Sequence, residues 1–427
     1  MTMSNPISTL NVRLHGDLIG TITHVGHDRT LFAFTEAYLN NELRPTLGLS
    51  FKDSFGSLIT QFKVTQTQLI PFFSNLLPEA QMRSYLAERA GVNPVREFFL
   101  LWVLGQDLPG AITVEPADGE ALPPNLHQAS EDNTEPQAPM RFSLAGVQLK
   151  FSAVQQAHGG LTIPATGKGG AWIVKLPSTR FAGVPENEYA MMTLARMLGM
   201  DVPEIQLLPV NQIANIPQGI EQVGSSFNHA QAFAIKRFDR AHRQAVHFED
   251  FAQVFGIYPQ DKYQKASMRN IAQVIGMEGE QQDITEFTRR LVFNTLIGNA
   301  DMHLKNWAVI YKDRRTASIA PAYDFVSTVP YIPDDGASLK VSRSKKFRDF
   351  TYEELSHLAI KAKLPEKLVL DTAKQTVEKF YAVWAKEKAH LPLTNAVIDA
   401  IEAHLQTVPL RWVVRARVGE NGWNSVP

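Results

Sequence analysis

Apolar and polar residues alternate along residues 8–38, and this pattern is typical of strands that bury one face. Leu10, Val12 and Leu14 fall on one side of the chain, and Gly16-Asp17 then interrupts the run with turn residues. A period of two that is broken by such turns predicts an antiparallel meander of strands early in the sequence.

Between residues 67 and 106 the apolar positions change to helical spacing, and Asn93-Pro94 is a typical helix start. The strands and helices together predict a small α+β domain over residues 1–118. Proline and acidic residues then dominate residues 119–139, where apolar residues are sparse. This composition predicts a linker or an extended surface loop.

The rest of the chain divides into a strand-rich part and a helical part. Residues 140–237 contain short apolar runs separated by loops, whereas helical patterns dominate residues 238–427. One helix is predicted over residues 283–297, and Asp283 with Glu286 forms a capping-box-like start for it.

The composition excludes several kinds of site and binding partner. Hydrophobic residues make up 44% and charged residues 20% of the 427 residues, and the formal net charge is −1. This balance gives no global attraction to nucleic acid or anionic membrane. Cysteine is absent, which excludes disulfides, thiolate metal sites and cysteine nucleophiles and suits a reducing cytosol. No apolar run approaches the ~20 residues of a spanning helix, and no signal peptide is predicted, so we expect a cytoplasmic protein.

The candidate chemistry lies in three residues that follow the helix predicted over residues 283–297. Asn306 comes five positions after Asp301, and Asp324 follows a second short apolar stretch. Phosphoryl transfer from ATP needs a carboxylate that accepts the proton of the acceptor hydroxyl. It also needs an amide oxygen and a second carboxylate that hold magnesium. Each residue alone is more commonly a cap or a loop residue, and only the set favours a kinase.

Lys175 supplies a fourth group that such a site needs. It ends the apolar run 172–174, so its ammonium group can point into a cleft and hold the α- and β-phosphates of ATP. Glu188, on the helix that follows, is its expected partner. A lysine that protects a strand edge from aggregation is the alternative interpretation.

Three further features are weaker candidates. The small residues of 143–150 form a turn whose backbone N–H groups can approach phosphate, although a plain hairpin has the same pattern. Residues 236–238 lie where a strand leaves the strand-rich part, which is where adenine binds in two-lobed kinases. His303 either contributes to the site or is a buried, hydrogen-bonded side chain.

A cluster of cations follows Asp324. It either meets an acidic substrate, phosphate or DNA, or forms an ordinary solvated face. Its members are Arg343, Lys345, Lys346 and Arg348.

Taken together, these residues resemble the HipA family, the serine/threonine-protein kinase toxins of HipA–HipB toxin–antitoxin pairs. The resemblance covers nearly the whole chain. It implies an α+β, two-lobed protein-kinase-like (HipA/PI-kinase-like) fold with an added small N-terminal α+β domain and a mainly helical C-terminal lobe. The kinase N-lobe would be 140–237 and the C-lobe 238–427. The segments that carry the resemblance are 72–79, 142–150, 237–240, 249–253, 301–306 and 322–324.

The resemblance also implies roles for single residues. Asp301 would be the catalytic base, Asn306 and Asp324 would bind Mg²⁺, and Ser143 aligns with the autophosphorylated serine of the family. Contacts with ATP are implied for Ala145, Gly146, Val147, Gln148, Leu149, Lys150, Lys175, Lys236, Arg237, Phe238, His303, Asn306, Tyr323 and Asp324. The chain departs from the family pattern at Val147 and Leu149, where that pattern has alanine and glutamate.

Partners follow from the same resemblance. The expected cofactors are ATP and Mg²⁺, and the expected protein substrate is an aminoacyl-tRNA synthetase, glutamyl-tRNA synthetase in the family, whose loss inhibits translation and promotes growth arrest and persistence. The expected inhibitor is a HipB-like helix-turn-helix antitoxin, through which the chain would repress its own operator DNA. No membrane partner is expected.

Two other functions remain open from the residues alone. The pattern Asp-x-His-x-x-Asn also resembles the catalytic loop of phosphoinositide kinases, so the chain could be a small-molecule or lipid kinase. It could also be a kinase-like scaffold that represses DNA with its partner, although intact Lys175, Asp301, Asn306 and Asp324 argue against a dead enzyme.

Overall fold

The computed structural model describes residues 8–117, 150–156, 160–163, 169–178, 180–216, 230–241, 244–332 and 336–410. These residues form two compact units. The first unit contains the described residues before 118 together with 238–262 and 308–317, and the second contains the other described residues. The domain boundaries expected at 118, 139 and 237 stay predictions, and the predicted linker lies outside the described residues.

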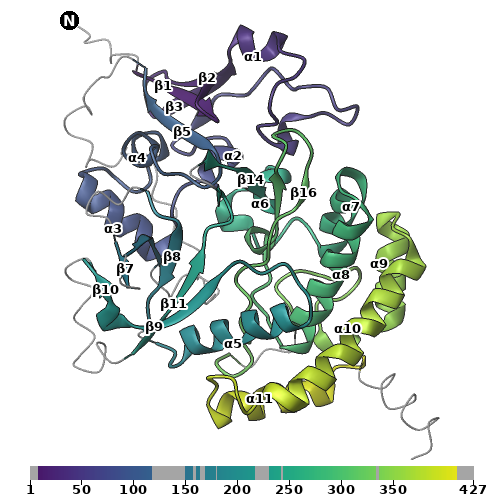
Figure 1. Cartoon of the computed structure of the whole chain (residues 1–427). Coiled ribbons are helices and arrows are strands. Elements are labelled where there is room, and N and C mark those ends of the chain that lie inside the picture. Colours follow the sequence, from purple (N-terminus) through teal and green to yellow (C-terminus); the bar gives the residue numbers. More distant parts are fainter. Residues whose placement is uncertain are drawn as a thin grey trace, which may run out of the picture. The chain divides into compact units, whose positions relative to one another are not determined.

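The first unit is built around a five-stranded antiparallel sheet (Figure 1). Its strand order is β4-β3-β2-β1-β5. Leu10, Val12 and Leu14 on β1 are fully buried, so the alternation in the sequence marks the core face, and the predicted meander is confirmed. The strands are β1 (Ser8–Leu14), β2 (Asp17–His24), β3 (Arg29–Phe34), β4 (Thr65–Gln66) and β5 (Ile112–Pro116).

Aromatic rings fill the core of the first unit. The ring centroids of Phe32 and Phe73 are 5.0 Å apart, and those of Phe51 and Phe72 are also 5.0 Å apart, both in edge-on geometry. Such pairs add to the stabilisation from burial alone. The helices around this core are α1 (Glu36–Asn40), η1 (Leu49–Phe51), α2 (Pro71–Ser74), α3 (Ala80–Ala90) and α4 (Glu97–Leu104).

The helix start predicted at Asn93-Pro94 was wrong by a few residues. Helix α4 begins at Glu97. The side-chain oxygen of Asn93 accepts the N–H of Val95 at 3.0 Å, so Asn93 closes a local turn instead of capping the helix.

Two distant segments complete the first unit. Strands β14 (His247–Asp250) and β15 (Ala308–Tyr311) form an antiparallel pair. The ring Nε2 of His247 lies 2.7 Å from the carbonyl oxygen of Leu47. The other elements of these segments are β12 (Arg240–Ala241), β13 (Gln244–Ala245), α6 (Phe251–Val254) and η5 (Pro259–Asp261).

Glu249, on β14, is a buried carboxyl group that binds two neighbours. Its Oε1 accepts the N–H of Leu49 at 2.8 Å and the hydroxyl of Tyr311 at 2.5 Å. Burial raises the pKa of Glu249 to about 8, because the charged form is poorly solvated there. The carboxyl group is therefore largely protonated at neutral pH.

The second unit contains a six-stranded sheet with order β10-β7-β6-β8-β11-β9 (Figure 1). The apolar run 172–174 lies in strand β8, and helix α5 and strand β11 belong to the same part. The elements are β6 (Lys150–Gln155), β7 (Leu161–Thr162), β8 (Trp172–Lys175), α5 (Val184–Met197), β9 (Ile205–Pro209), η3 (Val210–Gln212), β10 (Ile213–Ala214) and β11 (Gln231–Lys236).

Helices make up most of the remaining second unit, and α8 packs against α10 (Figure 1). Buried Phe293 on α8 and Phe380 on α10 lie 6.1 Å apart between ring centroids. The elements are α7 (Met268–Glu278), α8 (Gln281–Leu296), η6 (Leu304–Asn306), β16 (Ser318–Ile319), η7 (Phe347–Asp349), α9 (Tyr352–Ala362), α10 (Glu366–Glu387) and α11 (Asn395–Thr407).

The predicted cap of helix α8 was wrong in its residues. Glu280 and Asp283 form the capping box, whereas Asp283 and Glu286 were expected to form it. Asp283 is the third helical residue, and its Oδ2 accepts the N–H of Glu280 at 2.7 Å. The motif therefore lies one turn earlier than the sequence suggested.

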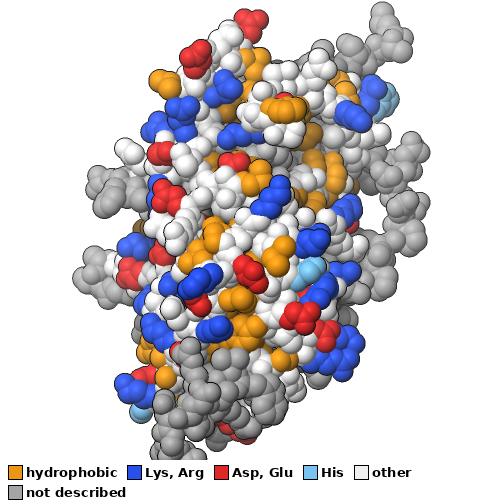
Figure 2. Space-filling model, turned by 90° about the vertical axis from the view of Figure 1, so that its right-hand side faces the viewer, with side chains coloured by type: hydrophobic (Ala, Val, Ile, Leu, Met, Phe, Trp, Pro, Cys, Tyr) orange, Lys and Arg blue, Asp and Glu red, His pale blue; other side chains and the backbone are white. Residues whose placement is uncertain are grey.

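The charges on the surface and the apolar content of the helices agree with the composition. Basic and acidic side chains are interspersed on the described part of the face in Figure 2, as the net charge near zero predicts. Within the described ranges, we find no helix with the length and apolar character that crossing a membrane requires.

The buried carboxyl group of Glu249 predicts a pH-dependent stability. In an unfolded chain a glutamate titrates near pH ~4.3, so the folded protein retains a proton that the unfolded chain has lost. Stability from this group is present at low pH and is lost as the pH rises through about 8. In Glu249→Gln this loss is absent, and thermal unfolding from about pH 6 to about pH 9 should show a smaller fall in Tm than in the wild type.

Glu88→Gln is the matched control, because Glu88 is an exposed residue of the same unit. Its Tm should follow that of the wild type at every pH. Parallel curves for the wild type and Glu249→Gln would contradict the assignment of a neutral, buried Glu249.

Candidate functional site

A sharp turn after helix α8 leads into the loop that carries Asp301. Gly298 adopts the left-handed conformation with φ +65°. A Cβ atom at this position would lie 2.7 Å from a methyl carbon of Val329. Both the dihedral angle and the close contact favour glycine here. Helix α8 ends at Leu296, one residue before the expected end.

Asn299 joins the Asp301 loop to the Asp324 segment. Its Oδ1 accepts the backbone N–H of Asp301 at 3.0 Å, and its Nδ2 donates to Oδ1 of Asn294 at 2.8 Å. The same Nδ2 lies 3.5 Å from the carbonyl oxygen of Asp324. One buried amide therefore ties two of the predicted site residues to the end of helix α8.

Thr328 adds a second tie between the same two segments. Its hydroxyl accepts the N–H of Ala300 at 2.8 Å and donates to the carbonyl oxygen of Gly298 at 3.0 Å. The side chain is 1% exposed, so these bonds are shielded from water and are costly to break.

The carboxylate of Asp301 is held by a tyrosine. The hydroxyl of Tyr263 donates to Oδ1 of Asp301 at 2.8 Å, and Asp301 is 9% exposed. The ring of Tyr263 also packs edge-on against His303, with 5.0 Å between ring centroids. The predicted base is thus nearly buried and oriented by a neighbouring donor.

Asn306 and Tyr323 fix the rest of the loop. The Nδ2 of Asn306 donates to the carbonyl oxygen of Asp301 at 3.0 Å, which leaves its Oδ1 as the atom for a metal. The hydroxyl of Tyr323 donates to the carbonyl oxygen of Lys305 at 2.9 Å. The segment before Asp324 is therefore tied directly to η6.

A buried ion-pair group lies at the end of strand β8. The Nζ of Lys175 is 2.5 Å from Oε1 of Glu188 on helix α5, and it also pairs with Oδ1 of Asp324. The side chains of Lys175 and Glu188 are 11% and 3% exposed. Glu188 is therefore the partner of Lys175, as the sequence suggested, and Asp324 supplies a second carboxylate.

Burial and neighbouring charges shift the pKa values of this ion-pair group in opposite directions. Burial disfavours the Lys175 ammonium, but Asp324 and Glu188 outweigh this effect and raise the pKa of Lys175. Burial also opposes ionisation of Asp324, yet Lys175 and Lys150 lower the pKa of Asp324 to about 2. Burial dominates at Glu188 and raises the pKa of Glu188 to about 7. Lys175 and Asp324 are thus both charged at neutral pH.

Helix α5 also positions the backbone beyond Asp324. The side chain of Asn187 donates to the carbonyl oxygen of Ser327 at 2.9 Å and accepts the N–H of Ser327 at 3.0 Å. Asp324 itself has φ +58°, which is uncommon for a residue with a side chain. Asn187 therefore bonds directly to the chain that follows this turn, whereas Glu188, next to it on α5, acts on Asp324 through their shared partner Lys175.

The predicted nucleotide-binding segments are only partly described. Lys150 begins strand β6 and is exposed, and its charge contributes to the low pKa of Asp324. Lys236 pairs with Glu204 at 3.0 Å on the surface. The backbone N–H of Arg237 donates to the carbonyl oxygen of Ala171 at 2.7 Å.

Phe238 belongs to the first unit, where its ring packs against Phe248 with 4.9 Å between centroids. The other predicted residues of the loop lie outside the described residues. These are Ser143, Ala145, Gly146, Val147, Gln148 and Leu149.

The cation cluster after Asp324 is largely engaged in local contacts. Nε of Arg343 pairs with Oε2 of the buried Glu354 at 2.6 Å, and its Nη1 pairs with Glu353 at 3.1 Å. The Nζ of Lys345 donates to the carbonyl oxygen of Ser338 at 2.6 Å. These contacts favour the solvated-face interpretation over a free anion-binding patch.

Sequence reasoning missed the residues that orient the site. Tyr263, Asn187, Asn299 and Thr328 each bond to the Asp301 or Asp324 segment, and none was singled out from the sequence. A polar residue next to a helix-ending glycine, as in Gly298-Asn299, was the one signal available. The others act across long sequence separations, which no local pattern records.

The arrangement can hold a metal–phosphate group. Asp324 offers a carboxylate, and Asn306 offers an amide oxygen. Mg²⁺ usually takes few protein ligands and completes its shell with phosphates and water, so this donor set fits it. Within the described ranges, no group of three or more His, Asp or Glu side chains could hold a metal alone.

Comparison with protein families gives two matches that together span most of the chain. The model of the HipA-like C-terminal domain matches residues 142–384, and the model of the HipA N-terminal domain matches residues 10–115.

Individual relatives agree with these matches. "Putative kinase Y4dM" of Sinorhizobium fredii is 56% identical over 407 residues, which cover 95% of this chain and 98% of the relative. "Serine/threonine-protein kinase toxin HipA" of Shewanella oneidensis is 27% identical over 374 residues, or 76% of each chain.

A solved structure shows the same fold. It is the toxin–antitoxin complex of HipA, HipB and its operator DNA from Shewanella oneidensis MR-1. It aligns with a TM-score of 0.71 and 20% sequence identity, over 93% of this chain and 95% of that chain. The expected α+β kinase-like fold with an added N-terminal domain is confirmed.

Removal of the Asn299 amide should destabilise the second unit. Asn299→Ala deletes its bonds to Asp301, Asn294 and Asp324 and leaves buried polar groups without partners. The expected loss in the free energy of unfolding is about 1–3 kcal/mol, measured by urea unfolding. Gln375→Ala, on the exposed face of α10, is the control and should change it by less than about 0.5 kcal/mol. Equal stability of the two variants would show that Asn299 does not tie the loop.

Proposed function

The chain belongs to the HipA family of serine/threonine-protein kinases, and we propose that it transfers the γ-phosphoryl group of ATP to a hydroxyl group of a protein through Asp301, Lys175, Asn306 and Asp324. The observation that carries this proposal is the joining of the Asp301 and Asp324 segments by Asn299, beside the ion pair of Lys175 with Asp324.

Asp301 would act as the base. Its carboxylate is nearly buried, and Tyr263 holds Oδ1 through a hydrogen bond of 2.8 Å. Oδ2 would then accept the proton of the serine or threonine hydroxyl. The hydroxyl oxygen would form a bond to the γ-phosphorus, and the bond between that phosphorus and the leaving oxygen of ADP would break. Tyr263 would serve as a positioning residue, because its hydroxyl acts through Asp301.

Lys175 and Asp324 would change partners when the nucleotide binds. Lys175 now neutralises Asp324. Lys175 would exchange that carboxylate for phosphate oxygens of ATP, while Glu188 keeps the lysine in place. Asp324, with the amide oxygen of Asn306, would then hold Mg²⁺, which neutralises the charge on the phosphates.

The rest of the nucleotide would be bound by the segments that the resemblance implies. Backbone groups of Ala145–Lys150 would surround the phosphates, with Val147 and Leu149 as departures from the family pattern. Lys236–Phe238 would hold adenine, and His303 and Tyr323 would lie near the nucleotide. Tyr323 already bonds to the loop of Asp301 through Lys305, which supports a place beside the nucleotide.

The protein substrate and the partner are proposed from the family. We propose that the chain is a toxin that phosphorylates an aminoacyl-tRNA synthetase, the glutamyl enzyme in keeping with the family, and so arrests growth in the cytoplasm. A HipB-like helix-turn-helix antitoxin would neutralise it and place it on operator DNA as a co-repressor. The complex of a homologue with HipB and operator DNA supports this proposal.

Ser143 would provide self-inactivation. It stands at the edge of the predicted phosphate loop, and a phosphate there adds roughly two negative charges. These charges would repel the loop from the phosphates of ATP and so prevent a second round of transfer.

Intact-mass and phosphosite analysis tests the chemistry and the self-inactivation together. The wild type and Asp301→Asn are incubated separately with ATP and Mg²⁺. The wild type should gain phosphate at Ser143, and Asp301→Asn should do so roughly 10²–10⁴-fold more slowly, because it lacks the base. Asp399→Asn, an exposed aspartate on α11, is the control and should match the wild type.

The outcomes separate the proposals. Phosphate at other serines, in the wild type alone, would support the kinase activity and contradict self-inactivation through Ser143. Equal phosphorylation of Asp301→Asn would remove Asp301 as the base. Absence of phosphate in every protein, with no transfer to an aminoacyl-tRNA synthetase, would favour a small-molecule acceptor or a scaffold without catalysis.

A further inference from the structure

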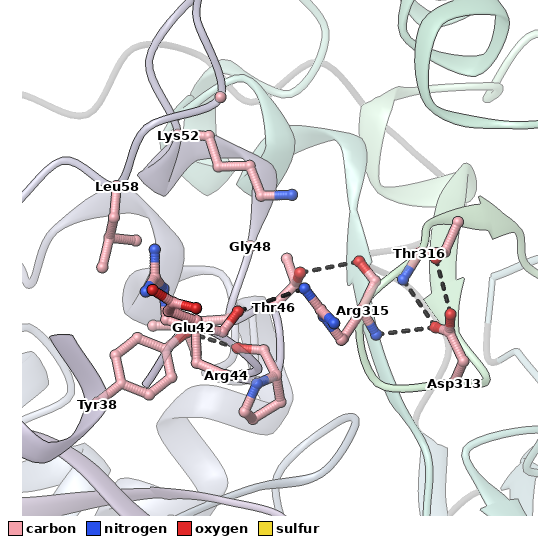
Figure 3. Close-up of a pocket in the computed structure, with 13 residues that line it drawn as sticks. Tyr38, Glu42, Arg44, Thr46, Gly48, Lys52, Leu58, Asp313, Arg315 and Thr316 are labelled. Carbon is pink, nitrogen blue, oxygen red and sulfur yellow. Dashed lines mark hydrogen bonds between the residues drawn. The ribbon is translucent and has the colours of Figure 1, made fainter. Parts of the chain in front are cut away.

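The first unit contains a pocket that the kinase chemistry does not use. Its volume is about 380 Å³, within the range of small-molecule sites. One wall is the segment from Tyr38 to Leu58, and the other is the turn of Asp313, Arg315 and Thr316 (Figure 3). Both walls belong to the first unit.

Hydrogen bonds fix the two walls to each other. The N–H of Thr46 donates to the carbonyl oxygen of Arg314 at 2.8 Å, and its hydroxyl donates to the carbonyl oxygen of Arg315 at 2.9 Å. The hydroxyl of Tyr38 donates to the carbonyl oxygen of Pro45 at 2.6 Å. The pocket is therefore part of the packed structure, not a gap between loose loops.

Three cations line this pocket without a carboxylate partner. Within the described residues, Arg44, Lys52 and Arg315 form no ion pair, although Lys52 and Arg315 reach toward the same space from opposite walls (Figure 3). Carbonyl oxygens orient both arginines: Arg44 donates to those of Leu39 and Asn41 at 3.2 and 3.0 Å, and Arg315 donates to that of Glu42 at 3.4 Å. Carbonyl groups orient a guanidinium but do not cancel its charge.

Several other cations of the same unit are paired. Arg13, Arg83, Arg96, Arg240 and Lys262 each have a carboxylate oxygen at 2.7 Å. These five do not line the pocket, whereas the three cations that line it have no carboxylate partner within the described residues.

The two acidic residues of the pocket form no ion pair with its three cations within the described residues. Asp313 uses Oδ1 to accept the N–H groups of Arg315 and Thr316 at 2.8 and 2.7 Å, and Oδ2 to accept the hydroxyl of Thr316 at 2.7 Å. Its carboxylate therefore shapes the turn. Glu42 is exposed and forms no ion pair within the described part of the chain. The pocket retains a positive excess of one, from three cations and two acids.

We propose that this pocket binds a small organic phosphate, independently of the kinase site. Arginine presents a planar fork that matches a phosphate group, and lysine adds a compact charge. The hydroxyl of Thr316 and the ring of Tyr38 lie in the same pocket, where the sugar or other body of the ligand would pack. A phosphate with such a body fits the volume and the mixture of charged and apolar walls better than a bare ion.

Calorimetric titration with inorganic pyrophosphate tests the site. The wild type should bind it, with an affinity that falls as salt is raised. Lys52→Gln combined with Arg315→Gln should weaken binding roughly tenfold or more, because two charge-assisted contacts are lost. Lys63→Gln is the matched control, since Lys63 is an exposed lysine of the same unit outside the pocket. Absence of binding by the wild type, or equal binding by the double variant, overturns the proposal.

A second measurement needs no variant. The wild type is acetylated briefly with and without pyrophosphate, and modification of each lysine is quantified by peptide mapping. Pyrophosphate should slow acetylation of Lys52 several-fold and leave Lys63 unchanged. Equal rates at Lys52 with and without the probe contradict the site even if calorimetry detects binding elsewhere.

Discussion

The ion-pair group of Lys175, Glu188 and Asp324 is the interaction on which the candidate site depends. It joins strand β8, helix α5 and the Asp324 turn at one ammonium group. Burying these charges is costly, and the cost is offset only while all partners are in place. A change of any partner leaves an uncompensated charge near the catalytic loop. In the proposed function, nucleotide and metal would satisfy the same charges in a new arrangement.

A second set of contacts connects this group to Asp301, the proposed catalytic base. Asn299 bonds to the backbone of both Asp301 and Asp324, and Thr328 joins the same two chain segments at the end of helix α8. Helix α8 packs against α10 in the second unit, so these bonds tie the proposed site residues to a packed helix. Rigid placement matters in phosphoryl transfer, where the protein contributes mainly position and charge.

The sequence predicted features that depend on neighbouring residues and missed contacts between residues far apart in the chain. The alternation at Leu10 to Leu14 gave the meander, and the order of Lys175, Asp301, Asn306 and Asp324 gave the candidate site. Helix starts were shifted at Asn93 and Asp283, because short polar side chains can either close a turn or cap a helix. Tyr263 lies 38 positions before Asp301, and Asn187 lies 140 positions before Ser327. Only the folded chain brings such pairs together, so neither contact has a signature in the sequence.

The exchange of partners at Asp324 is the central claim, and ATP affinity measured with and without Mg²⁺ tests it most directly. Calorimetry on the wild type and Asp324→Asn supplies the comparison. The account predicts that Mg²⁺ tightens ATP binding in the wild type and does so much less in the variant. Without Mg²⁺ the variant should bind ATP at least as well, because Lys175 is released from a competing carboxylate. The same Mg²⁺-dependent gain in both proteins would contradict the account.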